Sequence, residues 1–189
     1  MHSKHHASSI AVGAALALAL LWNPGSAGAP STVDLVEPGE PGEPLVVAGT
    51  VTDASGRPVK GASLHVFQAD AAGRYTAEKA MDERNARLAG DIVTGDDGRY
   101  EIRTVRPGGY PGEIDTGDGV KRKIPGHIHF EIDAEGHPRR RAQMVFADDP
   151  RLTPHWREWA RRGRHPVVEL ERGEDGVLRG THDWVLEEP

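Results

Sequence analysis

Residues 125–132 read PGHIHFEI, and this pattern predicts a β-strand. A Pro-Gly pair marks its start, β-branched and aromatic residues follow, and a turn-like segment at 133–136 ends it. On a strand, residues two apart point to the same face, so His127 and His129 project together while Ile128 and Phe130 project to the other side. The Cα atoms of the two histidines would lie about 6.5 Å apart, and rings at that separation can bind one metal ion.

The histidine pair also has a simpler interpretation, which is two surface side chains on an edge strand. For an isolated His-x-His that interpretation comes first. Other residues of the chain must therefore supply the argument for a metal site.

Short strand candidates separated by Gly- and Pro-containing turns fill most of the chain. One helix is expected at 154–162, where Trp156 and Trp159 lie three apart and share a face. Residues 78–88 are charged and are expected to form a short helix or a loop. Many short strands at regular turn spacing predict an all-β sandwich. The expected strands are 45–51, 62–68, 92–94, 100–105, 125–132, 143–146, 167–170 and 177–186.

The N-terminal part of the chain resembles a targeting segment followed by a linker. Lys4, an apolar run from Ile10 to Leu21 and the small residues at 27–29 fit a signal peptide over residues 1–29. The apolar run is too short for a membrane span. Residues 30–45 are rich in Pro, Gly and Glu and are expected to be a linker, which leaves 46–189 as one domain. This organisation predicts a secreted or periplasmic protein.

Composition removes several classes of function. The chain has no cysteine, which excludes disulfides, thiolate metal sites and a cysteine nucleophile. The formal net charge is −6 and argues against a nucleic-acid-binding protein, whose footprint is basic. The local basic runs at 121–123, 139–141 and 161–162 are interpreted as solvated surface.

Two of the three tyrosines lie in glycine-containing turns or loops. Tyr75 follows a Gly-Arg pair, and Tyr110 stands between a glycine and a proline that restricts the backbone. Tyr100 lies in an alternating strand and is expected to be a core or sheet aromatic. Taken singly, each loop tyrosine is explained by loop packing, so the tyrosines alone do not specify a site.

Several short segments over residues 47–146 carry a resemblance through their order and spacing. They are GTVTD at 49–53, GRPV at 56–59, VFQAD at 66–70, GRY at 73–75, DGRY at 97–100, TVRPGGYP at 104–111 and GHIHF at 126–130. In this arrangement the chain resembles the intradiol ring-cleavage dioxygenases, which include catechol and protocatechuate dioxygenases. The resemblance implies a β-sandwich of the intradiol dioxygenase or prealbumin-like type.

The resemblance also implies a mononuclear non-haem Fe(III). Position by position, its ligands would be Tyr75, Tyr110, His127 and His129, and Gln143 would line the site. A trivalent cation favours the phenolate of a tyrosine, whose free pKa is about 10. In the family a catechol displaces the tyrosine that matches Tyr110, which then acts as a base. Reaction with O₂ opens the ring to a muconate-type diacid.

One position departs from the family pattern. The family usually has an arginine three residues before the first ligand histidine, where it stabilises charge on the ring, and this chain has Ile124. Arg122 lies two residues earlier and is the candidate to replace it. The substitution bears on rate or on the class of substrate.

Two other functions stay open at this point. Residues 49–66 also resemble transthyretin-like modules of secreted proteins, which would make the domain a non-enzymatic binding module. A zinc hydrolase built on His127 and His129 would need a third His or carboxylate ligand and an open position for water. The scattered histidines at 65, 155, 165 and 182 are interpreted as surface or structural. The expected partners are a small aromatic diol and O₂, and the sequence is compatible with an oligomer.

Overall fold

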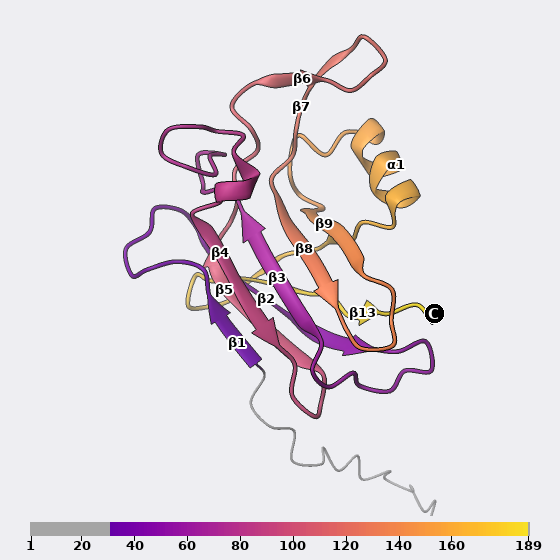
Figure 1. The fold of residues 1–189 in the computed structure, drawn as a ribbon. Coiled ribbons are helices and arrows are strands. Elements are labelled where there is room, and N and C mark those ends of the chain that lie inside the picture. Colours follow the sequence, from indigo (N-terminus) through magenta and orange to yellow (C-terminus); the bar gives the residue numbers. More distant parts are fainter. Residues whose placement is uncertain (1–30, 189) are drawn as a thin grey trace, which may run out of the picture.

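Two β-sheets packed face to face form the body of the molecule (Figure 1). The computed structural model describes residues 31–188. The first sheet has the order β1-β5-β2-β12-β11 with β13 also paired to β2, and the second has the order β10-β9-β8-β3-β4. This arrangement confirms the all-β sandwich with one short helix.

The strands of the first sheet are β1 (Ser31–Asp34), β2 (Pro44–Thr52), β5 (Arg99–Val105), β11 (Glu171–Arg172), β12 (Leu178–Thr181) and β13 (Trp184–Val185). Those of the second are β3 (Ser63–Gln68), β4 (Leu88–Val93), β8 (His127–Asp133), β9 (Arg140–Phe146) and β10 (Val167–Val168). A separate hairpin pairs β6 (Glu113–Asp115) with β7 (Lys121–Lys123). The helices are η1 (Glu83–Asn85), a 3₁₀ turn, and α1 (Pro154–Gly163).

The histidine strand β8 is the central strand of its sheet. It pairs antiparallel with β3 on one side and with β9 on the other. Ile128 and Phe130 enter the core between the sheets, whereas His127 and His129 face away from it and are nevertheless buried. The interpretation as surface histidines on an edge strand is therefore wrong. The strand reads as nearly continuous apolar and histidine residues because both of its faces are covered.

Two apolar clusters divide the interior. The larger fills the space between the sheets and includes Val47, Val66, Ile102 and Phe130. The smaller lies on the outer face of the second sheet, where α1 packs beside β9 (Figure 1). It contains both loop tyrosines, so the candidate site residues belong to this second cluster.

The expected linker at 30–45 lies against the sandwich. Ser31–Asp34 form β1, which pairs in parallel with β5, and Leu35 is buried in the main core. Farther along, Glu40 forms an ion pair with Arg87 at 2.7 Å. Val33 and Leu35, two residues apart, supply enough apolar surface to add an edge strand despite the Pro- and Gly-rich surroundings. The expected signal peptide at 1–29 lies outside the described residues.

The expected strand at 177–186 is interrupted. It forms β12 and β13, both paired in parallel with β2, with His182 and Asp183 between them. The Asp183 carboxylate accepts a hydrogen bond from the Thr50 backbone N–H at 2.8 Å, and Tyr100 donates its hydroxyl to the His182 carbonyl at 2.7 Å. Together with the main-chain bond from the His182 N–H to the Ala48 carbonyl at 3.0 Å, these bonds hold the chain against the sheet at the break.

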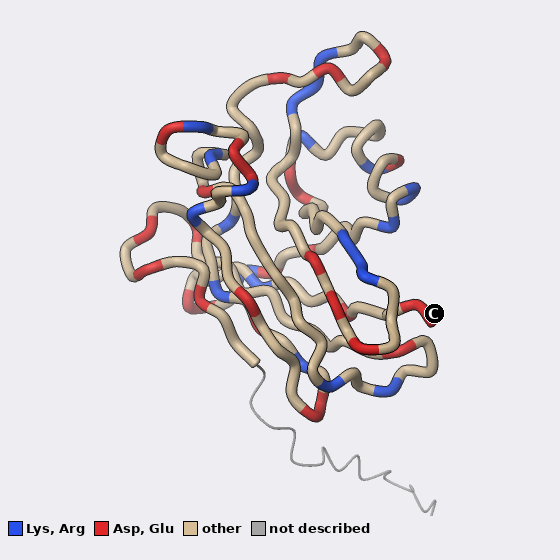
Figure 2. The backbone as a smooth tube through the Cα atoms, in the orientation of Figure 1, with Lys and Arg blue, Asp and Glu red and all other residues tan. Residues whose placement is uncertain are grey.

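Charges of both signs are interspersed along the strands and loops in the view of Figure 2, including the β6–β7 hairpin. Within residues 31–188, no helix has the length and apolar character needed to cross a membrane.

Candidate metal centre

The strand β8 brings the two histidine rings together. Their Nε2 atoms lie 3.1 Å apart, and the ring centroids lie 4.8 Å apart. His127 Nδ1 is 2.9 Å from the Pro125 carbonyl oxygen, which can only accept, so Nδ1 carries the proton and the Nε2 lone pair faces His129. The Phe67 ring, opposite His129 in the β3–β8 register, stacks on the His129 ring at 4.3 Å. The strand and its neighbour thus fix both imidazoles.

The Tyr75 hydroxyl completes a triangle with the two histidines. Its oxygen is 2.8 Å from His129 Nε2 and 3.3 Å from His127 Nε2. Tyr75 is 0% exposed. Its backbone N–H donates to the Ala80 carbonyl at 3.2 Å, and its carbonyl accepts from the Arg87 N–H at 2.8 Å. Both backbone polar groups of Tyr75 are therefore hydrogen-bonded, which fixes the residue within its loop.

Tyr110 adds a fourth donor atom, and the second oxygen, to the group. Its hydroxyl is 3.1 Å from the Tyr75 hydroxyl and donates to a Glu83 carboxylate oxygen at 2.6 Å. Tyr110 is only 4% exposed, whereas Glu83 is an exposed residue of η1 that reaches in from the surface. This carboxylate was not anticipated from the sequence, where residues 78–88 read only as a charged helix or loop.

Two glycines allow the site loops to approach each other closely. Gly73 has a φ of +79°, and a Cβ built on it would collide with the Gly109 carbonyl oxygen, next to Tyr110. A Cβ on Gly126 would collide with the Pro107 carbonyl oxygen. Gly126 also donates its N–H to the Asp149 carboxylate at 2.8 Å. Side chains at these positions would push apart the loops that carry Tyr75, Tyr110 and His127.

The donor atoms fit one metal ion. Two phenol oxygens and two imidazole nitrogens form a continuous group in which neighbours are 2.8–3.3 Å apart. Nitrogen and oxygen ligands about 2.0–2.2 Å from a transition metal lie roughly 3 Å from each other, which is the spacing observed. Burial lowers the pKa of His127, and burial together with the His127 charge lowers that of His129 to about 3. Both imidazoles are therefore neutral and able to bind a metal at neutral pH.

Without a metal, both phenols are protonated. Burial raises the pKa of Tyr75 above its ordinary value. Burial and, after it, the hydrogen bond to Glu83 raise the pKa of Tyr110. A bound trivalent cation reverses this preference because it stabilises the phenolate.

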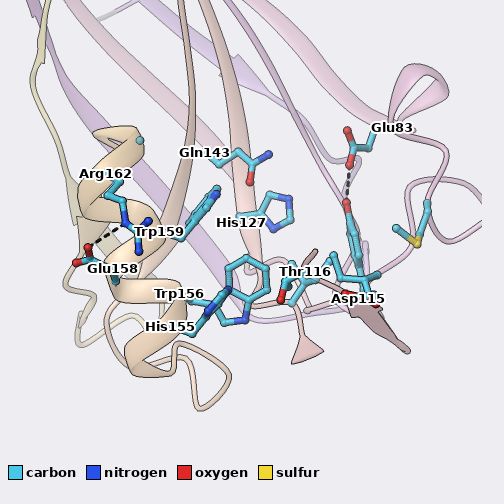
Figure 3. A pocket seen from close by; sticks show the side chains of 15 residues that line it. Glu83, Asp115, Thr116, His127, Gln143, His155, Trp156, Glu158, Trp159 and Arg162 are labelled. Atoms are coloured by element: carbon cyan, nitrogen blue, oxygen red, sulfur yellow. Dashed lines mark hydrogen bonds and ion pairs between the residues drawn. The ribbon is translucent and has the colours of Figure 1, made fainter. Parts of the chain in front are cut away.

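A pocket of about 750 Å³ opens onto the group of donors. Tyr110, His127 and Gln143 line it, while Tyr75 and His129 are not among its lining residues and lie deeper. Figure 3 shows His127 and Gln143 between Trp156 and Trp159 of α1 on one side and Asp115 and Thr116 of the β6–β7 hairpin on the other. A ligand in this pocket reaches the donor group from the side of Tyr110 and His127.

Comparison with known proteins identifies the family. A family model described as Dioxygenase matches residues 22–184. The chain belongs to the intradiol ring-cleavage dioxygenase family. Members of this family use non-haem Fe(III).

The relatives of this family member include the protocatechuate 3,4-dioxygenase beta chain of Burkholderia cepacia, 39% identical over 64% of this chain and 52% of that protein. Catechol 1,2-dioxygenase of Acinetobacter baylyi is 32% identical over 66% of this chain and 44% of that protein. The chain thus spans about half the length of the curated relatives it matches.

Solved structures agree with the family assignment. Catechol 1,2-dioxygenase from Pseudomonas arvilla C-1 has a TM-score of 0.68 at 28% identity, over 86% of this chain and 59% of that one. The dioxygenase domain of a dioxygenase carbohydrate-binding protein fusion from Streptomyces sp. SirexAA-E has a TM-score of 0.61 at 28% identity, over 84% of this chain and 90% of that one.

The structure brings together all five site residues expected from the intradiol resemblance. Tyr75, Tyr110, His127 and His129 form the donor group, and Gln143, opposite His129 in the β8–β9 register, lines the pocket. Tyr100 lies in the main core, as expected.

Arg122 does not replace the family arginine in this intradiol family member. Its guanidinium donates two hydrogen bonds to the Asp118 carboxylate, at 2.7 and 2.8 Å, and Arg122 does not line the pocket. Ile124 is buried and does line it. The position that usually carries a cation is therefore apolar here.

The four scattered histidines at 65, 155, 165 and 182 are all half-buried, and His155 lines the pocket. His165 stacks on Trp159 at 4.2 Å and accepts from the Gln143 backbone N–H at 3.1 Å. Among residues 31–188 there is no group of three or more His, Asp or Glu placed to hold a metal ion. The third His or carboxylate ligand of a zinc hydrolase is therefore not found beside the histidine pair within the described part of the chain.

Proposed function

We propose that the protein is an intradiol dioxygenase that cleaves a catechol-type ring with O₂ and uses a mononuclear Fe(III) bound by Tyr75, Tyr110, His127 and His129. The observation that carries the proposal is the meeting of two phenol oxygens and two imidazole nitrogens, all buried, at the inner end of a pocket. The family match supports the same reaction class.

The reaction balances without any other reductant. The carbon–carbon bond between the two hydroxyl-bearing carbons breaks, and each of these carbons gains one oxygen atom of O₂ to become a carboxyl group. The ring is oxidised and O₂ is reduced, so catechol and O₂ combine one to one into a muconate-type diacid. When bound, Fe(III) supplies the Lewis acid that binds the diol oxygens and activates the ring.

Tyr110 and His127 are the residues of the donor group that line the pocket, and of these two Tyr110 carries the phenol oxygen. We assign it the role of base, which takes a proton from one catechol hydroxyl. The neutral phenol then donates its hydrogen bond to Glu83, which is the contact seen in the structure at 2.6 Å. Tyr75 and His129 lie deeper than the pocket lining and keep the rest of the donor group in place.

Metal content, colour and stoichiometry test the proposal together. Protein loaded with iron is expected to bind one iron per chain and to be burgundy to red, through charge transfer from tyrosinate to Fe(III). With catechol it is expected to consume one O₂ per diol cleaved. Colourless protein with stoichiometric zinc, or protein that binds no metal, would contradict the assignment and favour a hydrolase or a binding module.

We further propose that the protein acts outside the cytoplasm, after removal of residues 1–29. The support is the apolar run at 10–21 and the small residues at 27–29. N-terminal sequencing of material from the extracellular or periplasmic fraction is expected to start near Pro30. An intact Met1 in that material would contradict the proposal.

A further inference from the structure

The pocket is much larger than a single-ring diol needs. Its volume is about 750 Å³, whereas a cavity of about 150 Å³ holds benzene in a protein core. It lies within the range of about 300–1,000 Å³ that is usual for ligands of two or more rings. Catechol bound at the donor group would leave most of this space to water.

The wall of the pocket away from the donor group is aromatic and apolar. Trp156 and Trp159 of α1 lie edge to face, with ring centroids 5.6 Å apart. The Trp156 indole N–H donates to the Lys123 carbonyl at 2.8 Å, so its polar atom is already satisfied. Ile114 and Ile124 add aliphatic surface. These groups favour an uncharged, apolar part of a ligand.

The charged residues of the lining oppose an anionic ligand. Glu83, Asp115 and Glu158 contribute carboxylates, and the basic residues of the lining are Arg162 and His155. The Glu158 carboxylate is also paired with Arg161, at 2.7 Å. Arg162 donates to Glu158 at 2.9 Å on the surface of α1, a pair drawn as a dashed line in Figure 3. Arg122 is held by Asp118, and Ile124 takes the place of the family arginine. A carboxylate on the ligand would enter a region where Glu83 and Asp115 are negative and the lining guanidinium, Arg162, is already paired.

From these features we infer, building on the proposed function, that the site accepts uncharged catechols with a bulky apolar substituent and discriminates against carboxylated catechols. Substituents at ring positions 4 and 5 lie on the edge of the ring opposite the two hydroxyl groups. With the hydroxyls at Tyr110 and His127, such a substituent would extend away from the donor group, where it can contact Trp156 and Trp159 of the same pocket.

The test compares four diols on iron-loaded protein. They are catechol, 4-phenylcatechol, 3,4-dihydroxybenzoate and its methyl ester, which matches the acid in shape but has no charge. Binding is measured by calorimetry and turnover by O₂ uptake. We expect 4-phenylcatechol to bind at least about tenfold more tightly than catechol, and the ester to bind at least about tenfold more tightly than the acid.

Two variants address the two causes separately. Asp115→Asn combined with Glu158→Gln is expected to narrow the gap between ester and acid, whereas Glu135→Gln, an exposed acid outside the pocket, leaves it unchanged. Trp159→Ala is expected to reduce the preference for 4-phenylcatechol. If this variant is unstable by thermal melting, the comparison of the four diols on the unmodified protein still decides the question.

Failure of the inference and failure of the proposed function give different results. If catechol is cleaved while the acid binds as tightly as the ester and the phenyl group adds no affinity, the inferred selectivity is wrong and the dioxygenase activity stands. If the expected order of affinities is found but no diol is cleaved, the selectivity is supported and the proposed reaction is wrong.

Discussion

At the scale of single residues, the polar atoms of the donor group lie within hydrogen-bond distance of one another or of neighbouring groups. Tyr110 donates to Glu83, His127 Nδ1 donates to the Pro125 carbonyl, and the Tyr75 hydroxyl lies within hydrogen-bond distance of both Nε2 atoms. Buried polar groups rarely lack a hydrogen-bond partner. Here the expected metal ligands serve as partners for one another.

Replacing Tyr110 by Phe removes the hydroxyl group and keeps the aromatic ring. The ring should keep its edge contact with Tyr75, at a centroid distance of 5.8 Å, so the fold should survive. We expect the visible absorption band to shift and turnover to fall at least about a hundredfold, because both a ligand and a base are lost. Absorption spectra and O₂ uptake of iron-loaded protein check this.

Tyr100→Phe is the matched control. Tyr100 is equally buried, but its hydroxyl donates to the His182 carbonyl in the main core. The change should cost about 1 kcal/mol of unfolding free energy and leave the colour intact. A Tyr100→Phe protein that lost its colour, beside a Tyr110→Phe protein that kept it, would refute the ligand assignment.

Glu83 is expected to position Tyr110. Glu83→Ala removes the acceptor of the Tyr110 hydroxyl, and hydrogen bonds to charged groups contribute about 1.5–3 kcal/mol. We expect kcat for catechol to fall about tenfold or more with a smaller change in KM. Glu83→Gln, which keeps an acceptor oxygen, should restore part of the loss, and Glu78→Ala, in the same exposed segment, should have no effect. Equal loss in all three variants would exclude a specific role for Glu83.

At the scale of elements, the helix and strands with a periodic residue pattern could be predicted from the sequence. Short strands that form only by pairing with another segment could not. The histidine strand and helix α1 carry their own signals, which are alternation and the spacing of Trp156 and Trp159. Strands β1, β6, β7 and β11 have two to four residues each and exist through pairing with distant or hairpin partners. The expected strand at 92–94 begins instead at Leu88, because β4 pairs along the full length of β3.

The packing of the site loops depends on Gly73. Both Gly73 and Gly56 have a φ near +80°, so replacement of either by Ala carries backbone strain of about 1–2 kcal/mol. A Cβ on Gly56 meets nothing within 4 Å, whereas one on Gly73 collides with the Gly109 carbonyl. We expect Gly73→Ala to cost a further 1–3 kcal/mol or so and to weaken iron binding. Denaturant unfolding and iron titration of the two variants measure the difference, and equal behaviour would contradict the close-packing argument.

At the scale of the whole molecule, the sandwich core and the site are separate clusters that share strand β8. The strand and its two faces could be predicted from the alternation of residues in the sequence. The same kind of argument explained Tyr75 and Tyr110 only by loop packing. The family resemblance, not periodicity, joined the tyrosines to the histidines. Glu83 was missed as a pocket residue, and the role of the helix that carries Trp156 and Trp159 could not be decided, because the positions of both segments follow from tertiary packing.

Metal binding at this site is expected to release a defined number of protons. In the metal-free protein, burial raises the pKa values of Tyr75 and Tyr110 and lowers those of His127 and His129. At neutral pH the two phenols are therefore protonated and the two imidazoles are neutral. Binding Fe(III) through two tyrosinates should release two protons, so the apparent affinity should rise with pH by about a hundredfold per unit.

Calorimetric titration with ferric nitrilotriacetate, in two buffers of different protonation enthalpy, counts these protons. Tyr110→Phe should release one proton fewer than the unmodified protein, and Tyr100→Phe should release the same number. Comparing variants removes any protons that come from the iron reagent itself. If Tyr110→Phe released as many protons as the unmodified protein, Tyr110 would not bind iron as a phenolate. The site would then have at most one tyrosinate ligand, because Tyr75 is the only other tyrosine in contact with the histidines.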